Sequence, residues 1–346
     1  MKALIVTTDR QLELREISKP APGPYEALVK ILACGICATT DRELIKGTQP
    51  FNKDYPAILG HEAVGEVAAV GAKVKTFRVG DCVTRPVCIW PGEKRDGLAS
   101  AWGGFAEFGV VRDRLAMAAD GDNRLAGDYT ALRQNVVPKG TSVDDAVLAI
   151  SLAETSSWFN HAPAVGGKCV CVSGTGIAGL TIALWSKLAG ARKVIVLGRR
   201  AERLAQACEI AADYGVNVAA TPDVVAEVRR LTDDHGVDFF AEAVGGRDQI
   251  RLGLSMLASG GTLAVYGVPP GQIHDLNWSW NTAGKVSIAQ YPADEHLTYG
   301  WAVDMLRRGC VPGKKLMTHC WPFAEAKQAF VDVSAGKAVK GMLVMR

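Results

Sequence analysis

Hydrophobic and polar residues follow two different patterns along the chain. Up to about residue 150, short runs of alternating hydrophobic and polar residues are separated by turn residues; residues 11–17 (QLELREI) alternate, and the segment 20–24 (PAPGP) interrupts them. Alternation with a period of two is typical of half-buried strands, and clusters of proline and glycine are typical of turns. This part of the sequence therefore predicts a β-rich domain.

From about residue 168, apolar strands alternate with helical stretches, which is typical of a parallel sheet covered by helices. The predicted strands number six, as in a complete doubly wound dinucleotide-binding sheet. They span residues 169–173, 193–197, 216–219, 237–242, 262–266 and 286–290.

The last fifty or so residues change pattern again. They contain two predicted short helices, 301–308 and 323–333, and a closing strand, 341–344, which we expect to rejoin the first domain. The predicted domains are a catalytic domain formed by residues 1–155 and 293–346, and a nucleotide-binding domain formed by residues 156–292.

Composition narrows the class of protein. The chain has 346 residues, enough for roughly two domains, and its 39 basic and 36 acidic residues are scattered rather than clustered. We therefore expect no nucleic-acid partner. The nine cysteines show no disulfide spacing, and the N-terminus has too short an apolar stretch for a signal peptide, so we expect a reduced, cytoplasmic protein. Residues 169–186 are uncharged, but their glycine motif predicts a buried strand and helix rather than a membrane span.

A glycine motif follows the first strand of the second domain. Residues 174–179 read G-T-G-I-A-G and open a predicted helix. The first glycine allows a tight turn, the second a close approach of a pyrophosphate, and the third close packing of helix on strand. The predicted cofactor-binding residues here are Gly174, Thr175, Gly176, Ile177, Ala178 and Gly179. The alternative is a glycine-rich turn without a ligand.

The end of the second strand lacks the acid that would hold a ribose 2′-hydroxyl. Gly198, Arg199 and Arg200 stand there instead. A guanidinium pairs with phosphate, whereas a carboxylate repels it, so this segment predicts a preference for NADP(H) over NAD(H). The alternative is that both arginines belong to a solvated helix start.

A candidate metal site lies in the first domain. Cys34 and Cys37 form a C-x-x-C pair, which alone would be equally consistent with two buried thiols. His61 and Glu62 lie side by side in a glycine-bounded turn. Thiolate, imidazole and carboxylate are the ligand types of a catalytic zinc site with an open position.

The segment from Gly60 onward, G-H-E-A-V-G-E-V with V-G-D-C-V after it, resembles the zinc signature of the medium-chain alcohol and polyol dehydrogenases. The resemblance covers the whole chain and implies a GroES-like catalytic domain and a Rossmann nucleotide-binding domain. It also implies that Cys37 and His61 bind zinc, with Glu62 as a third ligand or an adjacent carboxylate.

Further roles are implied by the same resemblance. Glu154 matches an acid that binds zinc directly or through water, although it could be a helix-cap acid, and Lys340 is expected at the cofactor. Thr39 matches a hydroxyl that relays the substrate proton; its alternative role is turn capping. The family usually reads C-x-[ST]-D here, and this chain has an extra residue, so Thr40 is a rival for the relay.

A second, structural zinc is not expected. Many relatives carry four closely spaced cysteines beyond the first zinc cysteine, but this chain offers only Cys88 in that region. We expect packing to hold this lobe, through Trp90 and Trp102, and we expect one zinc per chain.

The resulting hypothesis is a zinc-dependent oxidoreductase that moves a hydride between NADP(H) and the carbinol carbon of a small alcohol. Residues 40–47 are similar to a segment of microbial glucose dehydrogenases, which favours a sugar or polyol substrate over simple or aromatic alcohols. A homodimer or homotetramer is expected. The alternatives are a zinc-free quinone or enoyl reductase of the same superfamily and a non-catalytic binding protein on this fold.

Overall fold

The computed structural model describes residues 1–49, 52, 54–122, 129–267 and 286–345. Its contacts divide the chain into two compact units. The first unit comprises Met1–Ser151 and Tyr299–Arg346, and the second comprises Leu152–Thr298. The first unit thus includes the C-terminal segment, and the division falls near residues 151 and 298, compared with predicted boundaries at 155 and 292.

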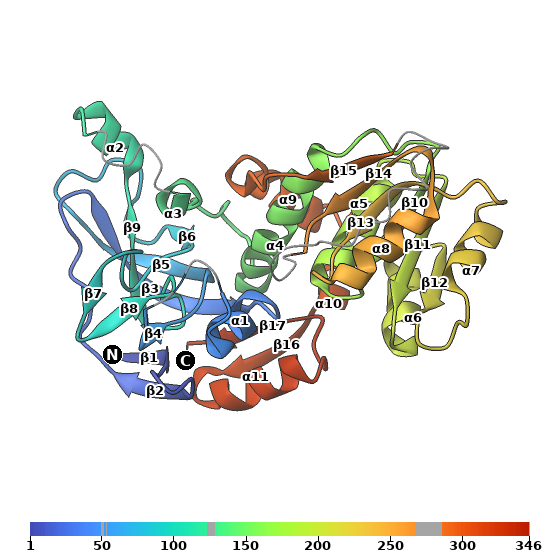
Figure 1. Ribbon diagram of the computed structural model, residues 1–346. Helices are drawn as coiled ribbons and strands as arrows, with labels where there is room; N and C mark the ends of the chain where they lie inside the picture. Colours follow the sequence, from blue (N-terminus) through green and yellow to red (C-terminus); the bar gives the residue numbers. More distant parts are fainter. Residues whose placement is uncertain (50–51, 53, 123–128, 268–285, 346) are drawn as a thin grey trace. The chain divides into compact units, whose positions relative to one another are not determined.

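The first unit is built on two β-sheets (Figure 1). Its strands are β1 (Lys2–Val6), β2 (Leu12–Glu16), β3 (Glu26–Ile36), β4 (Ala57–Ile58), β5 (Glu62–Val70), β6 (Cys82–Thr84), β7 (Lys94–Arg95), β8 (Leu98–Ser100), β9 (Phe108–Arg112), β16 (Met317–Pro322) and β17 (Lys340–Val344). One sheet has the order β2-β1-β4-β8-β7. The other has the order β16-β17-β3-β5-β6, and β9 also pairs with β3.

Short helices complete this unit, and two longer ones cross its boundary. The helices are α1 (Thr40–Lys46), α2 (Arg114–Ala119), α3 (Tyr129–Leu132), α4 (Val143–Asn160), α9 (Glu295–Arg307), α10 (Gly313–Leu316), the 3₁₀ helix η3 (Phe323–Glu325) and α11 (Ala326–Ser334). The helix predicted at 301–308 begins earlier, at Glu295, and the one predicted at 323–333 starts as a 3₁₀ turn.

The long strand β3 organises the sheet that carries the candidate metal site. It pairs antiparallel with β5 along one edge, and with β9 and then β17 along the other, so most of its residues are buried. Because β3 and β5 run in opposite directions, the end of β3 lies beside the start of β5, with Gly35 opposite Glu62. The pairing with β17 sets Ile36 opposite Gly341.

The second unit contains one six-stranded sheet. Its strands are β10 (Cys169–Ser173), β11 (Lys193–Gly198), β12 (Tyr214–Asn217), β13 (Val237–Glu242), β14 (Leu257–Val265) and β15 (Ser287–Gln290). All neighbouring strands are parallel and the order is β12-β11-β10-β13-β14-β15. This order confirms the predicted doubly wound fold. The third strand ends earlier than predicted because the Asn217 side chain accepts a hydrogen bond from the Ala219 N–H and turns the chain.

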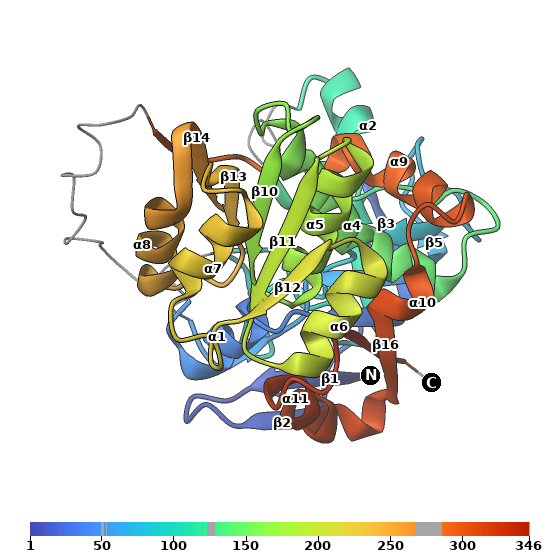
Figure 2. The same cartoon turned by 90° about the vertical axis from the view of Figure 1, so that its right-hand side faces the viewer.

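Helices cover both faces of this sheet (Figure 2). They are α5 (Ile177–Leu188), α6 (Ala201–Ile210), α7 (Val224–Leu231) and α8 (Arg247–Met256). Residues of α7 and α8 share one hydrophobic cluster with Cys171, Ile195 and Phe240, whereas α5 and α6 pack against β10, β11 and β12. No helix among the described residues has the length and apolar composition needed to cross a membrane.

Candidate metal and cofactor sites

Three of the four predicted metal ligands lie together at the adjoining ends of two strands. Cys37 follows the last residue of β3, His61 precedes β5, and Glu62 is its first residue. One ligand atom from each of these side chains can be chosen so that all lie within 4.8 Å of one another. A sulfur, a nitrogen and an oxygen donor at this spacing fit a zinc ion, whose ligands lie about 2.0–2.3 Å from the metal.

The His61 ring is held between two carboxylates. Its Nε2 lies 3.9 Å from Oε1 of Glu62, and its Nδ1 lies 3.5 Å from Oδ1 of Asp41. The Nε2 atom therefore faces Glu62, another candidate ligand, and the Nδ1 atom faces the Asp41 carboxylate. Burial lowers the pKa of His61, but the neighbouring Asp41 carboxylate and Cys37 sulfur outweigh it and hold that pKa well above its usual range.

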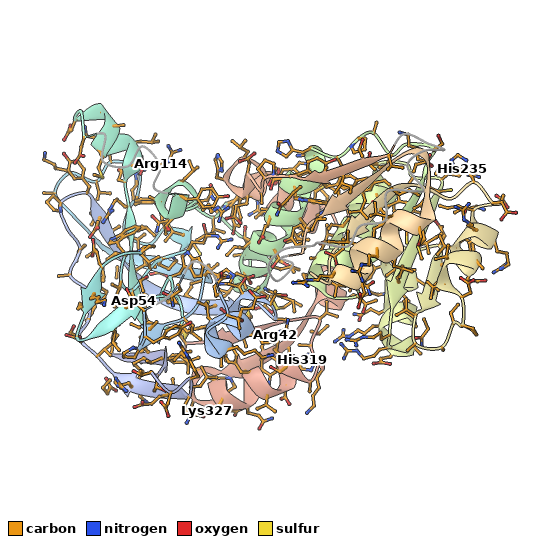
Figure 3. All side chains as sticks on the ribbon, in the orientation of Figure 1. Arg42, Asp54, Arg114, His235, His319 and Lys327 are labelled. Carbon is orange, nitrogen blue, oxygen red and sulfur yellow. The ribbon has the colours of Figure 1, made fainter. Side chains whose placement is uncertain are left out.

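Asp41 was not assigned a role in the sequence analysis. It lies in the first turn of α1 and is fully buried. One carboxylate oxygen accepts a hydrogen bond of 2.8 Å from the backbone N–H of Cys37, while the other faces His61. The next residue, Arg42, is exposed (Figure 3). Asp41 thus connects two candidate ligands, and its position four residues after Cys37 was the signal available in the sequence.

Glu62 forms an ion pair with Lys340, and both side chains are almost completely buried. Burial raises the pKa of Glu62, but Lys340 and His61 outweigh it, so the pKa is below its usual value and the carboxylate is ionised. Burial likewise lowers the pKa of Lys340, and Glu62 reverses this effect, so the pKa is raised. The predicted cofactor contact of Lys340 stays a prediction; its ion pair with Glu62 was not anticipated.

Two glycines make room for this arrangement. A Cβ on Gly35 would stand 2.4 Å from Oε2 of Glu62, so a side chain there would displace the carboxylate. Gly60, directly before His61, has a φ of 101°, and a Cβ there would stand 2.5 Å from the backbone nitrogen of Phe105. The glycine-bounded turn seen in the sequence is thus a steric requirement of the site.

The candidate proton relay begins α1. Thr39 is the N-cap residue of this helix, yet its side chain makes no capping hydrogen bond, and Thr40 is the first helical residue. The turn-capping alternative for the Thr39 hydroxyl therefore finds no support in the structure. The choice between Thr39 and Thr40 stays a prediction.

Glu154 lies in the second unit, in the interior of α4. Because it lies in the interior of the helix, Glu154 is not a helix-cap acid. It is half-buried, and its backbone oxygen accepts a hydrogen bond from the Ser157 hydroxyl. Its predicted role at zinc stays a prediction.

The lobe around Cys88 is held by side-chain contacts. Arg95 donates hydrogen bonds to the backbone oxygen and the sulfur of Cys88. The Trp90 indole donates to Glu26, which also pairs with Arg112, and the Arg112 guanidinium lies 3.8 Å from the Trp90 ring centroid. Trp90 thus has the packing role expected for it.

Trp102 has a further contact that was not predicted from the sequence. Its ring centroid lies 5.1 Å from that of His61, so this tryptophan borders a candidate metal ligand. It also packs against the hydrophobic core of the first unit. The two residues follow β4 and β8, which pair in parallel, and no local motif predicts this pairing.

The glycine loop has the geometry that its three glycines predict. Gly174 turns the chain with a φ of 120°. Gly176 is the N-cap of α5, and a Cβ there would meet nothing within 4 Å. A Cβ on Gly179 would stand only 2.0 Å from the backbone oxygen of Gly174, which is why helix and strand can pack so closely. The first-turn N–H groups of α5 suit a pyrophosphate, because a helix N-terminus favours anions.

Arginines gather at the end of β11. Gly198 is the last strand residue, Arg199 is exposed, and the exposed Arg200 is the N-cap of α6. A third arginine, Arg203, lies one turn further and is 7% exposed. Burial, and then the charge of Arg200, lower the pKa of Arg203. Arg203 was not among the residues predicted from the sequence, although its spacing of three from Arg200 was a visible signal.

Known proteins resemble the chain in both of its units. Residues 23–120 match the family model described as an alcohol dehydrogenase GroES-like domain, and residues 176–303 match that of a zinc-binding dehydrogenase. The chain is 30% identical to an L-threonine 3-dehydrogenase of Pyrococcus furiosus, over 96% of this chain and 95% of that protein. It is 27% identical to a sorbitol dehydrogenase of Bacillus subtilis, over 95% and 92% of the two chains.

A solved structure is similar along its full length. Alcohol dehydrogenase TADH from Thermus sp. ATN1 superposes with a TM-score of 0.82 at 25% identity, covering 100% of both chains. Because relatives of this similarity align over almost the whole chain, the protein belongs to the medium-chain dehydrogenase family and is an oxidoreductase of the zinc-type alcohol and polyol dehydrogenases.

Proposed function

We propose that the protein is a zinc-dependent dehydrogenase that transfers a hydride between NADP(H) and a secondary alcohol or the corresponding carbonyl compound. The observation that carries this proposal is the grouping of Cys37, His61 and Glu62 within 4.8 Å at the ends of β3 and β5. A zinc-free reductase would need no such group of donors.

Cys37 and His61 would hold the metal, with Glu62 or Glu154 as the carboxylate ligand. When bound, zinc supplies a Lewis acid that lowers the pKa of an alcohol. Asp41 positions the Cys37 backbone and the His61 ring, and Lys340 holds the Glu62 carboxylate. We assign the substrate proton to Thr39, with Thr40 as the rival, because the Thr39 hydroxyl makes no capping hydrogen bond.

The cofactor would lie with its pyrophosphate on the first turn of α5, against Gly176. Arg199 and Arg200 would pair with the 2′-phosphate of NADP, and the absence of an acid in this segment supports that preference. Arg203 adds a third positive charge beside Arg200. Lys340 stays a proposed cofactor contact.

We propose a sugar, a polyol or a sugar-derived alcohol as the substrate. The relatives described above are named for threonine and sorbitol, two small molecules with hydroxyl groups on a short carbon chain, which supports the size class. We also propose that the protein acts as a homodimer or homotetramer, and that it has no nucleic-acid or membrane partner.

A substrate panel with zinc analysis tests this function. Elemental analysis should find about one zinc per chain, and NADP-dependent oxidation should be fastest with a polyol or sugar. Reduction of quinones or enoyl compounds without zinc would favour the zinc-free reductase. Zinc and NADP binding without turnover on any alcohol or carbonyl compound would favour a non-catalytic binding protein. Two tightly held zinc ions would contradict the proposed single site.

A further inference from the structure

A buried tryptophan lies at the centre of an aromatic cluster in the second unit. Trp158, near the end of α4, is 2% exposed. Its ring centroid lies 5.4 Å from that of Tyr266, 5.4 Å from that of Tyr291 and 6.4 Å from that of Phe239. Tyr291 also stacks on His161, whose Nε2 lies 3.2 Å from a carboxylate oxygen of Asp294.

Among the described residues, none accepts a hydrogen bond from the Trp158 indole N–H. Trp185, another buried tryptophan of the same unit, donates its indole N–H to the Thr155 hydroxyl at 3.1 Å. Buried donors in native proteins are nearly always paired, with protein groups, water or a ligand. No described residue accepts from Trp158, so this donor is available to a bound group.

The cluster lies where a dinucleotide cofactor would place its redox-active half. Tyr266 directly follows β14, and Tyr291 directly follows β15, so both mark the carboxyl ends of parallel strands. Dinucleotides bind outside these carboxyl ends, with the pyrophosphate at the loop after β10. The arginines at the end of β11 would bind the adenosine half of the cofactor on one side of β10. The nicotinamide half would then lie on the other side of β10, near the ends of β13, β14 and β15.

We infer that the Trp158 indole N–H donates a hydrogen bond to the carboxamide carbonyl of the nicotinamide, and that Tyr266 and Tyr291 border the ring. A carboxamide oxygen is a strong neutral acceptor. The indole nitrogen is covered in the structure, so binding requires a shift of Tyr266 or Tyr291, and both of these side chains are only half-buried. This inference rests on the proposed cofactor.

Binding of cofactor analogues to the zinc-loaded protein tests it without measuring turnover. We would compare NADP with 3-aminopyridine adenine dinucleotide phosphate, which lacks the carboxamide carbonyl, in the unmodified protein and in Trp158→Phe. Calorimetry should show that Trp158→Phe weakens NADP binding about threefold to tenfold, the effect of one neutral hydrogen bond, and weakens the analogue less. Trp185→Phe, whose lost donor already has a protein acceptor, should leave the ratio of the two affinities unchanged.

Adenosine 2′,5′-bisphosphate separates the possible failures. If it and NADP bind the unmodified protein, but Trp158→Phe keeps the same ratio of NADP to analogue affinity, the Trp158 assignment is wrong and the proposed function stands. If neither binds, both are wrong. Should Trp158→Phe not fold, β-(3-benzothienyl)alanine at position 158 removes the N–H while keeping the ring shape, and the same change in the ratio is expected.

Discussion

Glu62 and Lys340 form an ion pair between the first residues of β5 and β17, with side-chain exposures of only 3% and 2%. Removing one partner of a buried pair leaves an uncompensated charge, which costs about 3–5 kcal/mol. Lys340→Met should therefore lower the free energy of unfolding of the metal-free protein by about that amount.

Denaturant unfolding measures this change in stability. Lys327→Met, at an exposed lysine of the same unit (Figure 3), is the matched control and should change little. Equal stability of the two variants would show that Glu62 is not ionised in the folded chain.

Loss of a candidate ligand should remove zinc and spare the cofactor. Cys37→Ser and His61→Ala should each abolish tight zinc binding and turnover, because each removes one donor of the group. NADPH binding should persist, since the glycine loop belongs to the second unit. Zinc analysis after dialysis and a fluorescence titration with NADPH measure the two effects. Cys34→Ala changes the other cysteine of the C-x-x-C pair and should retain zinc. Normal activity of His61→Ala in chelator-treated buffer would overturn the zinc assignment.

Asp41→Asn should weaken zinc binding while leaving all the candidate ligands in place. Groups that orient metal ligands typically contribute about 10–100-fold to metal affinity. The amide keeps the size of Asp41 but not its charge beside His61, nor both of its acceptor oxygens. Competition with a chromogenic chelator measures the affinity. An unchanged zinc dissociation constant would mean that the His61 ring needs no carboxylate partner.

Zinc affinity should rise with pH. The pKa of His61 in the metal-free chain lies well above the ordinary value of 6.5, and zinc requires the neutral imidazole. The raised pKa stabilises the folded metal-free chain below pH 6.5, and that stabilisation is lost as the pH rises through the folded-state pKa. Between pH 6.5 and the folded-state pKa of His61, zinc binding should release a proton. Calorimetry in buffers of different ionisation enthalpy detects this release. Asp41→Asn should reduce the proton release; a release that does not depend on Asp41 would assign it to another group.

NADP should be preferred over NAD by one to two orders of magnitude, because a charge-assisted hydrogen bond to phosphate contributes roughly 1.5–3 kcal/mol. Replacing Arg199 and Arg200 together by serine should weaken NADP binding at least about tenfold and leave NAD binding nearly unchanged. Arg230→Ser, at an exposed arginine on α7, is the control. An aspartate at Gly198 is a poorer probe, since a Cβ there would stand 2.6 Å from Cγ2 of Thr175. Equal catalytic efficiency with both cofactors in the unmodified protein would show that the arginines only face solvent.

The doubly wound sheet, the glycine loop and the residue types of the metal group could all be predicted from the amino-acid sequence. Each of these depends on neighbours along the chain: strand and helix periods, glycines that a tight turn requires, and donors that the two strand ends present in short motifs. This local character explains why the six predicted strands recur in the structure, with end shifts of at most two residues except in β14, which begins at Leu257 instead of residue 262.

The side chains that support those motifs could not be predicted in this way, because folding brings them in from distant segments. The Lys340 ammonium reaches the backbone oxygen of Ile36 across 304 residues because β17 pairs with β3. Trp102 meets His61, and Trp158 meets Tyr266 and Tyr291, by packing between segments that are distant in sequence. A hydrophobic period records which face of an element is buried, but not which distant element covers it. The contacts that position the candidate ligands therefore appear only once the chain is folded.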